Sequence, residues 1–311
     1  MSGKKSNPKK SSPAVIAALA ANLGIAATKF AAFIISGSSS MLAEAVHSVA
    51  DGGNQVLLLV GGRRARRPPD ARHPFGHGSE EYFYAFLVAL LLFSVGGLVA
   101  GYEGIHKLTH PEEVKHVGVA FGVLGVCAVL EFFSLRTACR ESLPLKGNAS
   151  WFTFIRTTAD AELPVVLLED TAGLVGLGFA AAGVAAAALT GDGRWDGVGS
   201  LAIALLLISV AVVLAVEMKS LLVGEAAAPA VQRRILAAAL DGPEIDRVIH
   251  LRTLQLGPEE LLVAAKVAVG ERVSAADVAR RIDQVERRIR AAVPAARLIY
   301  LEPDLDRATS R

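Results

Sequence analysis

Six long apolar stretches constrain the fold of this 311-residue chain more than any other feature. A helix needs about 20 predominantly apolar residues to cross the hydrocarbon core of a bilayer. Hydrophobic residues make up 52% of the chain and charged residues only 20%, a balance more apolar than that of most soluble proteins. We therefore predict an α-helical membrane domain over residues 13–217, with six transmembrane helices at 13–36, 40–62, 82–104, 114–135, 163–189 and 197–216.

Lysine and arginine are distributed unevenly between the two sides of these predicted helices. The positive-inside rule assigns the side with more of them to the cytoplasm. The N-terminal tail and the loops after the second and fourth helices hold 13 of them, whereas the other side holds only Lys107, Lys115 and Arg194. We expect both termini to be cytoplasmic in a cell (inner) membrane, with residues 1–12 forming a disordered cytoplasmic tail.

Overall charge and cysteine content argue against other classes of protein. The net charge of +2 gives no indication of nucleic-acid binding. Cys127 and Cys139 form no C-x-x-C pair, which argues against both a disulfide scaffold and a thiolate metal site.

Residues 218–311 have the pattern of a soluble domain. Apolar residues at helical spacing precede two predicted strands, 249–256 and 261–269. Ser274 and Asp277 resemble a capping box that opens a second amphipathic helix, and a short strand follows at 298–301, before Pro303. This order predicts a small α+β, ferredoxin-like domain.

The second apolar stretch carries charged groups that a bilayer tolerates poorly. Glu44, His47 and Asp51 lie at positions i, i+3 and i+7, on one stripe of a helix. Ionisable groups at this depth cost a few kcal/mol each and usually face a cavity or a partner. A histidine nitrogen and a carboxylate one turn apart can share a tetrahedral metal ion. The alternative is a hydrogen-bonded polar pair that holds helices together.

The fifth apolar stretch carries Glu169 and Asp170. At 1.5 Å per residue, Asp170 and Asp51 reach about the same level of the membrane from opposite sides. Glu169 points about 100° away from Asp170 and is either part of a ligand shell or the partner of a basic residue. Glycines beside these residues, among them Gly173, would let the helices approach closely.

Charged residues elsewhere in the apolar stretches have a simpler interpretation. Lys29, Glu103 and Glu131 lie toward the ends of their helices. We expect their long side chains to extend to the membrane interface.

The loop after the second stretch contains a second candidate metal site. Asp70, His73 and His77 place two imidazoles four residues apart beside a carboxylate. A solvated loop whose proline and glycine residues shape a turn is the alternative.

Two of these segments, SSSMLAEAVHSVAD at 38–51 and RPPDARHPFGHG at 67–78, resemble the signature of the cation diffusion facilitator family. VVLLEDTAGLVG at 165–176 is most similar to the branch that contains mitochondrial zinc-transporter-like proteins. The resemblance extends over nearly the whole chain. It implies six helices and a cytoplasmic domain of metallochaperone-like fold, in a homodimer that exports Zn²⁺ or a similar cation in exchange for protons.

The resemblance also implies which residues bind the transported ion. His47 and Asp51 match one ligand pair of the family, and Asp170 matches one member of the other pair. The fourth position is Val166, which cannot bind metal, so Glu169, Glu44 or water would complete the coordination. The family's loop site carries over onto Asp70, His73 and His77.

The family's cytoplasmic zinc pair does not carry over. The C-terminal domain has a single histidine, His250, and the expected ligand positions hold Ile249 and Tyr300. We therefore predict a C-terminal domain that folds without metal and contributes to the dimer.

Alternatives remain for the cargo and for the activity. One histidine among carboxylates suits Zn²⁺ and also Fe²⁺, Co²⁺ or Mn²⁺. A membrane metal sensor that does not transport is a second alternative. An intramembrane metalloprotease would need a motif such as H-E-x-x-H, which the sequence lacks, so we predict no enzyme activity and no catalytic residues.

Overall fold

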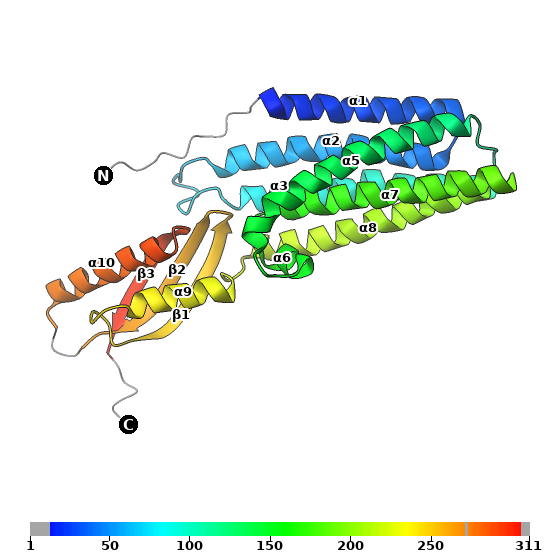
Figure 1. Ribbon diagram of the computed structural model, residues 1–311. Helices are drawn as coiled ribbons and strands as arrows, with labels where there is room; N and C mark the ends of the chain where they lie inside the picture. The colour runs from blue at the N-terminus through cyan, green and yellow to red at the C-terminus, as the bar shows by residue number, and fades with distance from the viewer. Residues whose placement is uncertain (1–12, 271–272, 306–311) are drawn as a thin grey trace. The chain divides into compact units, whose positions relative to one another are not determined.

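The computed structural model describes residues 13–270 and 273–305 (Figure 1). It contains two compact units, which we describe separately. The first comprises the chain up to Leu59 together with Phe86–Leu145 and Leu163–Ala215; the second comprises Val60–Ala85, Lys146–Glu162 and the chain from Val216 onward. The predicted N-terminal tail, residues 1–12, lies outside the described residues.

Long helices that run alongside one another make up the first unit and extend into the second (Figure 1). They are α1 (Pro13–Ser36), α2 (Ser39–Ala65), the continuous run of α3 (Glu80–Leu91), η1 (Leu92–Gly97) and α4 (Leu98–Thr109), α5 (Val117–Lys146), α7 (Glu162–Thr190) and α8 (Arg194–Val223).

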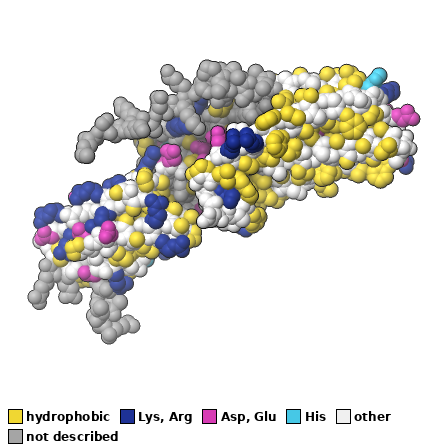
Figure 2. All heavy atoms as spheres, viewed as in Figure 1, with side chains coloured by type: hydrophobic (Ala, Val, Ile, Leu, Met, Phe, Trp, Pro, Cys, Tyr) yellow, Lys and Arg dark blue, Asp and Glu magenta, His cyan; other side chains and the backbone are white. Residues whose placement is uncertain are grey.

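Four of these helical segments are long and apolar enough to cross a membrane, so the protein is a multi-pass membrane protein. They are Glu80–Thr109, Val117–Lys146, Glu162–Thr190 and Arg194–Val223. Within the described residues, α1 contributes an apolar segment at Leu23–Ser36. The 27-residue α2 is long enough but carries ionisable groups. Figure 2 shows hydrophobic side chains over much of the visible surface of the helical unit.

A carboxylate from α8 fixes the start of α2. Gly37, with φ +65°, supplies the left-handed turn that ends α1. The buried Asp196 then accepts hydrogen bonds from the Ser38 hydroxyl at 2.7 Å and the Ser39 backbone N–H at 2.6 Å. A carboxylate at the N-terminus of a helix also interacts favourably with the helix dipole. The start of α2 is thereby attached to α8, which fixes the position of the polar stripe formed by Glu44, His47 and Asp51 along the helix bundle.

The apolar helical run Glu80–Thr109 is interrupted by the π-helical turn η1. The apolar stretch 82–104 predicted one uninterrupted helix here, whereas residues Leu92–Gly97 form the wider turn. Gly96 and Gly97 lie against Leu207 and Ile208 of α8, where a Cβ on Gly97 would come within 2.7 Å of Ile208 Cγ1. The small residues therefore allow α8 to approach closely.

A short helix that the sequence did not indicate, α6 (Trp151–Thr157), connects α5 to α7. The Ser150 hydroxyl caps it by accepting a hydrogen bond from the Thr153 backbone N–H at 3.0 Å. Seven residues are too few for a stable helix in isolation, so its contacts with the protein maintain it.

A small sheet domain at the C-terminus is confirmed, in the order helix, two strands, helix, strand. Its elements are α9 (Pro229–Leu240), β1 (Arg247–Gly257), β2 (Glu260–Ala268), α10 (Ala275–Ala292) and β3 (Ala296–Asp304). β1 pairs antiparallel with β2, and β2 pairs parallel with β3. The core joins Ile235 of α9 and Ile289 of α10 to alternate residues of the sheet, among them Val263 of β2.

Two details of this domain bear on the sequence predictions. The Ser274 hydroxyl accepts a hydrogen bond from the Asp277 backbone N–H at 3.2 Å, so the predicted cap of α10 forms. The last strand runs past Pro303, beyond the predicted end. β3 is an edge strand, where the missing N–H of a proline is tolerated.

Candidate metal sites

The polar stripe of α2 brings His47 and Asp51 together inside the first unit, which we call the membrane unit. His47 Nδ1 lies 3.4 Å from Asp51 Oδ1, and their side chains are 1% and 20% exposed. Among the described residues, neither imidazole nitrogen has a hydrogen-bond partner, nor has Asp51 Oδ1. Buried polar atoms normally have partners. The pair is therefore available to bind a cation or a proton.

Asp170 of α7 has a partner that sequence reasoning missed. Its Oδ2 accepts a hydrogen bond from the Ser134 hydroxyl of α5 at 2.9 Å. Among the described residues, His47, Asp51 and Asp170 are not gathered within ligand distance of one another. Of the three predicted ligands that match the family, His47 and Asp51 thus lie together, whereas Asp170 of α7 is hydrogen-bonded to Ser134 of α5.

Glu169 faces α2 and is hydrogen-bonded to an amide. The Asn54 side-chain N–H₂ donates to Glu169 Oε1, and both residues are buried. Asn54 lies three residues beyond Asp51, on the same side of α2. The sequence left open whether Glu169 is part of a ligand shell or the partner of a basic residue; in the structure its partner is the neutral amide of Asn54, which links α7 to α2.

Lys29 does not extend to the membrane interface, which corrects the prediction. Its side chain is fully buried, and Nζ lies 3.0 Å from Glu44 Oε2, also fully buried. Gly176 of α7 makes room for this pair, since a Cβ there would lie 2.6 Å from Glu44 Oε1. The expectation failed because periodicity within one helix cannot reveal an ion-pair partner on the next. The available signal was a lysine in one apolar helix and a glutamate in its neighbour.

Glu131 of α5 uses the space that Gly173 provides. A Cβ on Gly173 would lie 3.3 Å from a Glu131 carboxylate oxygen. We expected this glycine to bring helix backbones together, yet the room is taken by a carboxyl side chain. We use the name transmembrane polar cluster for Lys29, Glu44, His47, Asp51, Asn54, Glu131, Ser134, Glu169 and Asp170.

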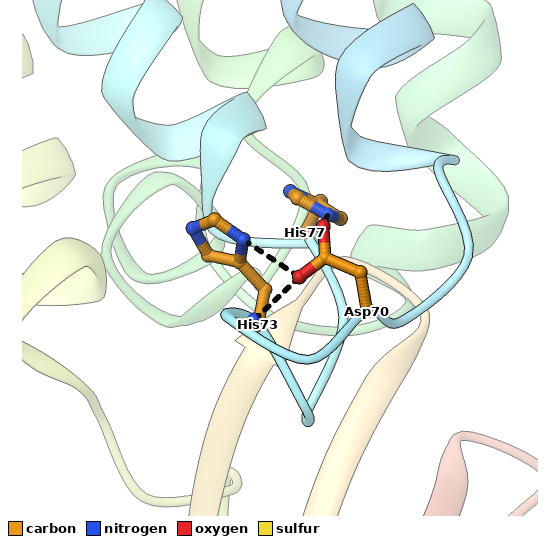
Figure 3. Close-up of side chains that lie close together, drawn as sticks. All are labelled: Asp70, His73 and His77. Carbon is orange, nitrogen blue, oxygen red and sulfur yellow. Dashed lines mark hydrogen bonds and ion pairs between the residues drawn. The ribbon is translucent and has the colours of Figure 1, made fainter.

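The loop between α2 and α3 gathers Asp70, His73 and His77 (Figure 3). Their ligand atoms lie within 4.8 Å of one another, and no other group of three ligating side chains in residues 13–270 and 273–305 does so. His73 Nδ1 lies 3.2 Å from Asp70 Oδ1, and His77 Nε2 lies 3.3 Å from Asp70 Oδ2. Two imidazoles and a carboxylate are a donor set that suits Zn²⁺. We call these three residues the loop cluster.

Asp70 also shapes the loop. Its Oδ1 accepts hydrogen bonds from the backbone N–H groups of His73 at 2.7 Å and Arg72 at 2.8 Å. These hydrogen bonds, led by that of His73, lower the pKa of Asp70 from 3.8 to about 2. The carboxylate therefore stays ionised at any ordinary pH, as a metal ligand must. The turn-forming role and the ligand role are compatible in one residue.

Within the second unit, the end of the loop that carries the loop cluster contacts the turn between β1 and β2. A Cβ on Gly78 would lie 2.6 Å from the Leu256 carbonyl oxygen, and one on Gly257 would lie 2.7 Å from Gly78 Cα. The strands lie beside the loop in Figure 3. Two glycines thus allow backbone-to-backbone contact between a segment that follows α2 and the C-terminal sheet.

The C-terminal sheet offers no comparable donor set. His250 is exposed on β1. Tyr300 is 55% exposed, and within the described residues His250 belongs to no group of three ligating side chains. Of the charged residues here, Lys266 pairs with Glu302 at 3.0 Å.

Residues 15–223 match the family model described as the cation efflux transmembrane domain. The chain belongs to the cation diffusion facilitator family. This match covers the transmembrane polar cluster and the loop cluster, so both candidate sites lie in the part of the chain that defines the family.

Curated relatives also support membership of this family. The human proton-coupled zinc antiporter SLC30A9, mitochondrial, is 30% identical over 250 residues, or 79% of this chain and 44% of that protein. Metal tolerance protein C4 of Arabidopsis thaliana is 30% identical over 84% of this chain and 58% of its own length. Magnetosome protein MamM of Paramagnetospirillum magneticum is 27% identical over 41% of each chain. The chain spans less than half the length of the SLC30A9 proteins it matches.

Proposed function

We propose that this cation diffusion facilitator exports a divalent transition-metal cation, with Zn²⁺ as the cargo and protons as the counter-ion. One observation carries the proposal: His47 and Asp51 lie side by side in a helix of a cation efflux domain, and among the described residues neither imidazole nitrogen nor Asp51 Oδ1 has a hydrogen-bond partner. Such nitrogen and oxygen atoms suit a cation that must enter and leave.

Proton exchange follows from the chemistry of the ligands. His47 binds a metal only when its nitrogen is unprotonated, so a proton and the metal compete for the same atom. Asp51 and Asp170 supply the negative charge that makes the buried site favourable for a dication. Glu169 and Glu44 are further candidate ligands, each of which would first leave Asn54 or Lys29.

The wider architecture is part of the proposal. Six transmembrane helices would place α1 and α2 beside the four apolar ones and would alternate between inward-open and outward-open states around the transmembrane polar cluster. The C-terminal α+β domain, ferredoxin-like in its order of elements, would lie in the cytoplasm and join two copies into a homodimer. The excess of arginine in the C-terminal parts of α2 and α5 and in the segments that follow them supports this orientation in a cell membrane.

Cargo and mechanism can be tested in proteoliposomes. Purified protein is reconstituted with an indicator for Zn²⁺ inside, and flux is recorded with and without a pH gradient. We expect Zn²⁺ flux that rises when protons can move in the opposite direction. Flux of Mn²⁺, Fe²⁺ or Co²⁺ in preference to Zn²⁺ would reassign the cargo. Stoichiometric metal binding without any flux would favour a metal sensor.

Orientation can be tested by cysteine labelling in a variant that lacks Cys127 and Cys139. The exposed Glu113 and Ala71 are suitable positions for single cysteines. An impermeant reagent added from outside should label the cysteine at 113 and leave the one at 71 unlabelled. The opposite pattern would reverse the proposed orientation and, with it, the proposed direction of transport.

A further inference from the structure

The segment that contains α6 is tied at both ends to membrane-spanning helices. α5 ends at Lys146 and α7 begins at Glu162, and both are among the four helices that are long and apolar enough to cross a bilayer. Within the second unit, Arg156 of α6 pairs with Glu217 of α8, and the Tyr82 hydroxyl of α3 donates a hydrogen bond to the Ala159 carbonyl at 2.9 Å. Tyr82 and Glu217 lie at the ends of the predicted membrane spans 82–104 and 197–216, so the segment that contains α6 is held where those helices reach the lipid headgroups.

α6 is anchored to the protein by one aromatic ring and exposes two others. Phe154 is only 4% exposed and holds the helix in place. Trp151 and Phe152 are 39% and 68% exposed, so a large apolar surface has no cover among the described residues. Tryptophan is enriched at the level of membrane headgroups, because its ring is apolar and its N–H is polar.

Each exposed aromatic ring carries a basic side chain over its face. Lys146 Nζ lies 5.2 Å from the centroid of the Trp151 ring, and Arg156 Cζ lies 5.6 Å from that of Phe152. Arg156 Nε also lies 3.3 Å from Glu217 Oε1, yet its side chain remains 59% exposed, which leaves guanidinium N–H groups for another acceptor. Lys146 donates to the carbonyl of Ala149.

We propose that α6 is an interfacial anchor that binds anionic phospholipids. Trp151 and Phe152 would lie at the boundary of the acyl chains, and Lys146 and Arg156 would contact the lipid phosphate. Arginine matches a phosphate with paired N–H groups, and basic residues near a membrane surface favour anionic lipids. A bilayer is the occupant because α6 and its flanking segment contact residues at the ends of two predicted membrane spans. The inference does not depend on the transported cargo.

Fluorescence quenching can test the contact, because the chain has only two tryptophans. The Trp195→Phe variant leaves Trp151 as the sole fluorophore. It is reconstituted into vesicles of phosphatidylcholine and phosphatidylglycerol, with brominated acyl chains on one lipid or the other at equal mole fraction. We expect brominated phosphatidylglycerol to quench Trp151 at least about twofold more strongly than brominated phosphatidylcholine. Equal quenching by the two lipids would overturn the preference for anionic headgroups.

Charge variants separate the phosphate contact from general burial. Lys146→Gln with Arg156→Gln should abolish the difference between the two lipids, whereas Arg156→Lys and the exposed control Arg290→Gln should retain it. If the loss of Arg156 destabilises the protein through its partner, Glu217→Gln is added to the same variant. Retention of the difference in the double-glutamine variant would contradict the proposal.

Two controls identify the occupant. Millimolar inorganic phosphate should not reduce the quenching by brominated phosphatidylglycerol; displacement by free phosphate would show a soluble-anion site and contradict lipid binding. The Trp151→Phe variant, which retains Trp195, reports whether reconstitution succeeded. If Trp195 is quenched and Trp151 is not, α6 is covered by protein, and the lipid anchor is wrong.

Discussion

The loop cluster and the transmembrane polar cluster hold similar ligand types in opposite ways. In the loop, three groups from eight successive residues lie within 4.8 Å of one another, and Asp70 and His73 are more than half exposed. In the membrane unit, the groups come from four helices, and most of them bind another side chain. The three groups of the loop cluster already lie close together, whereas the proposed membrane site would form by exchanging partners. That difference suits a stationary site and a site that must release its ion.

The largest expected effect is at the transmembrane polar cluster. Asp51→Ala or Asp170→Ala should reduce metal flux at least about tenfold, because each removes a proposed ligand, and even indirect contacts to a metal are worth 10–100-fold. The measurement is flux in proteoliposomes, with insertion checked by elution as a single species. Asp283→Ala, an exposed position on α10, is the control. Flux at the parent rate in either variant would remove that residue from the site.

The buried ion pair gives the next effect, in stability. Lys29→Met leaves Glu44 as an unpaired buried charge and should lower the free energy of unfolding by about 3–5 kcal/mol. Adding Glu44→Gln should recover most of that loss. Thermal or denaturant unfolding in detergent measures both. Arg290→Met breaks the exposed Arg290–Glu286 pair and should cost less than about 1 kcal/mol. Equal effects at the two pairs would contradict the distinction.

The loop cluster should affect metal content more than transport. His73→Ala with His77→Ala should remove one bound metal equivalent per chain, measured by elemental analysis, while flux falls less than about tenfold. The reason is that the loop lies outside the membrane unit and does not carry the ion across. Unchanged metal content would support a turn without a metal site.

Acid should disturb the loop only at low pH. The pKa of Asp70 is lowered from 3.8 to about 2, so the stability that its hydrogen bonds contribute is fully present above about pH 4 and is lost as the pH falls through about 2. The chemical shift of the carboxyl carbon, followed by NMR, should show this midpoint. A midpoint near 3.8 would mean that the hydrogen bonds of Asp70 to Arg72 and His73 do not persist in solution.

The smallest effect should be that of zinc on the C-terminal domain. The isolated segment 218–311 should fold without metal, and Zn²⁺ should leave its melting temperature unchanged, because its one histidine lacks companion ligands. Calorimetric titration and thermal unfolding test this. The matched comparison is the full chain, in which the loop cluster should bind. A tight stoichiometric event in the isolated domain would show a metal site that sequence and structure do not indicate.

Local patterns in the sequence determined a good deal. The apolar segments gave the membrane class, and spacing along α2 placed His47 and Asp51 on one stripe, where the structure brings them together. The loop cluster was visible because its members are close in sequence. The C-terminal order of elements and the cap at Ser274 were also local. Each of these depends on backbone geometry within one element, which the chain specifies by itself.

Tertiary structure alone decided which groups face each other. Ser134, Asn54 and Lys29 became partners of Asp170, Glu169 and Glu44 only when four helices packed. Periodicity gives the face of a helix but not the neighbour that covers it, because packing angles and helix order are set by many side chains at once. The same limit hid α6, a helix of seven residues that depends on its contacts with the rest of the protein. It also hid the contact of Gly78 with Gly257, two residues that are distant in the chain.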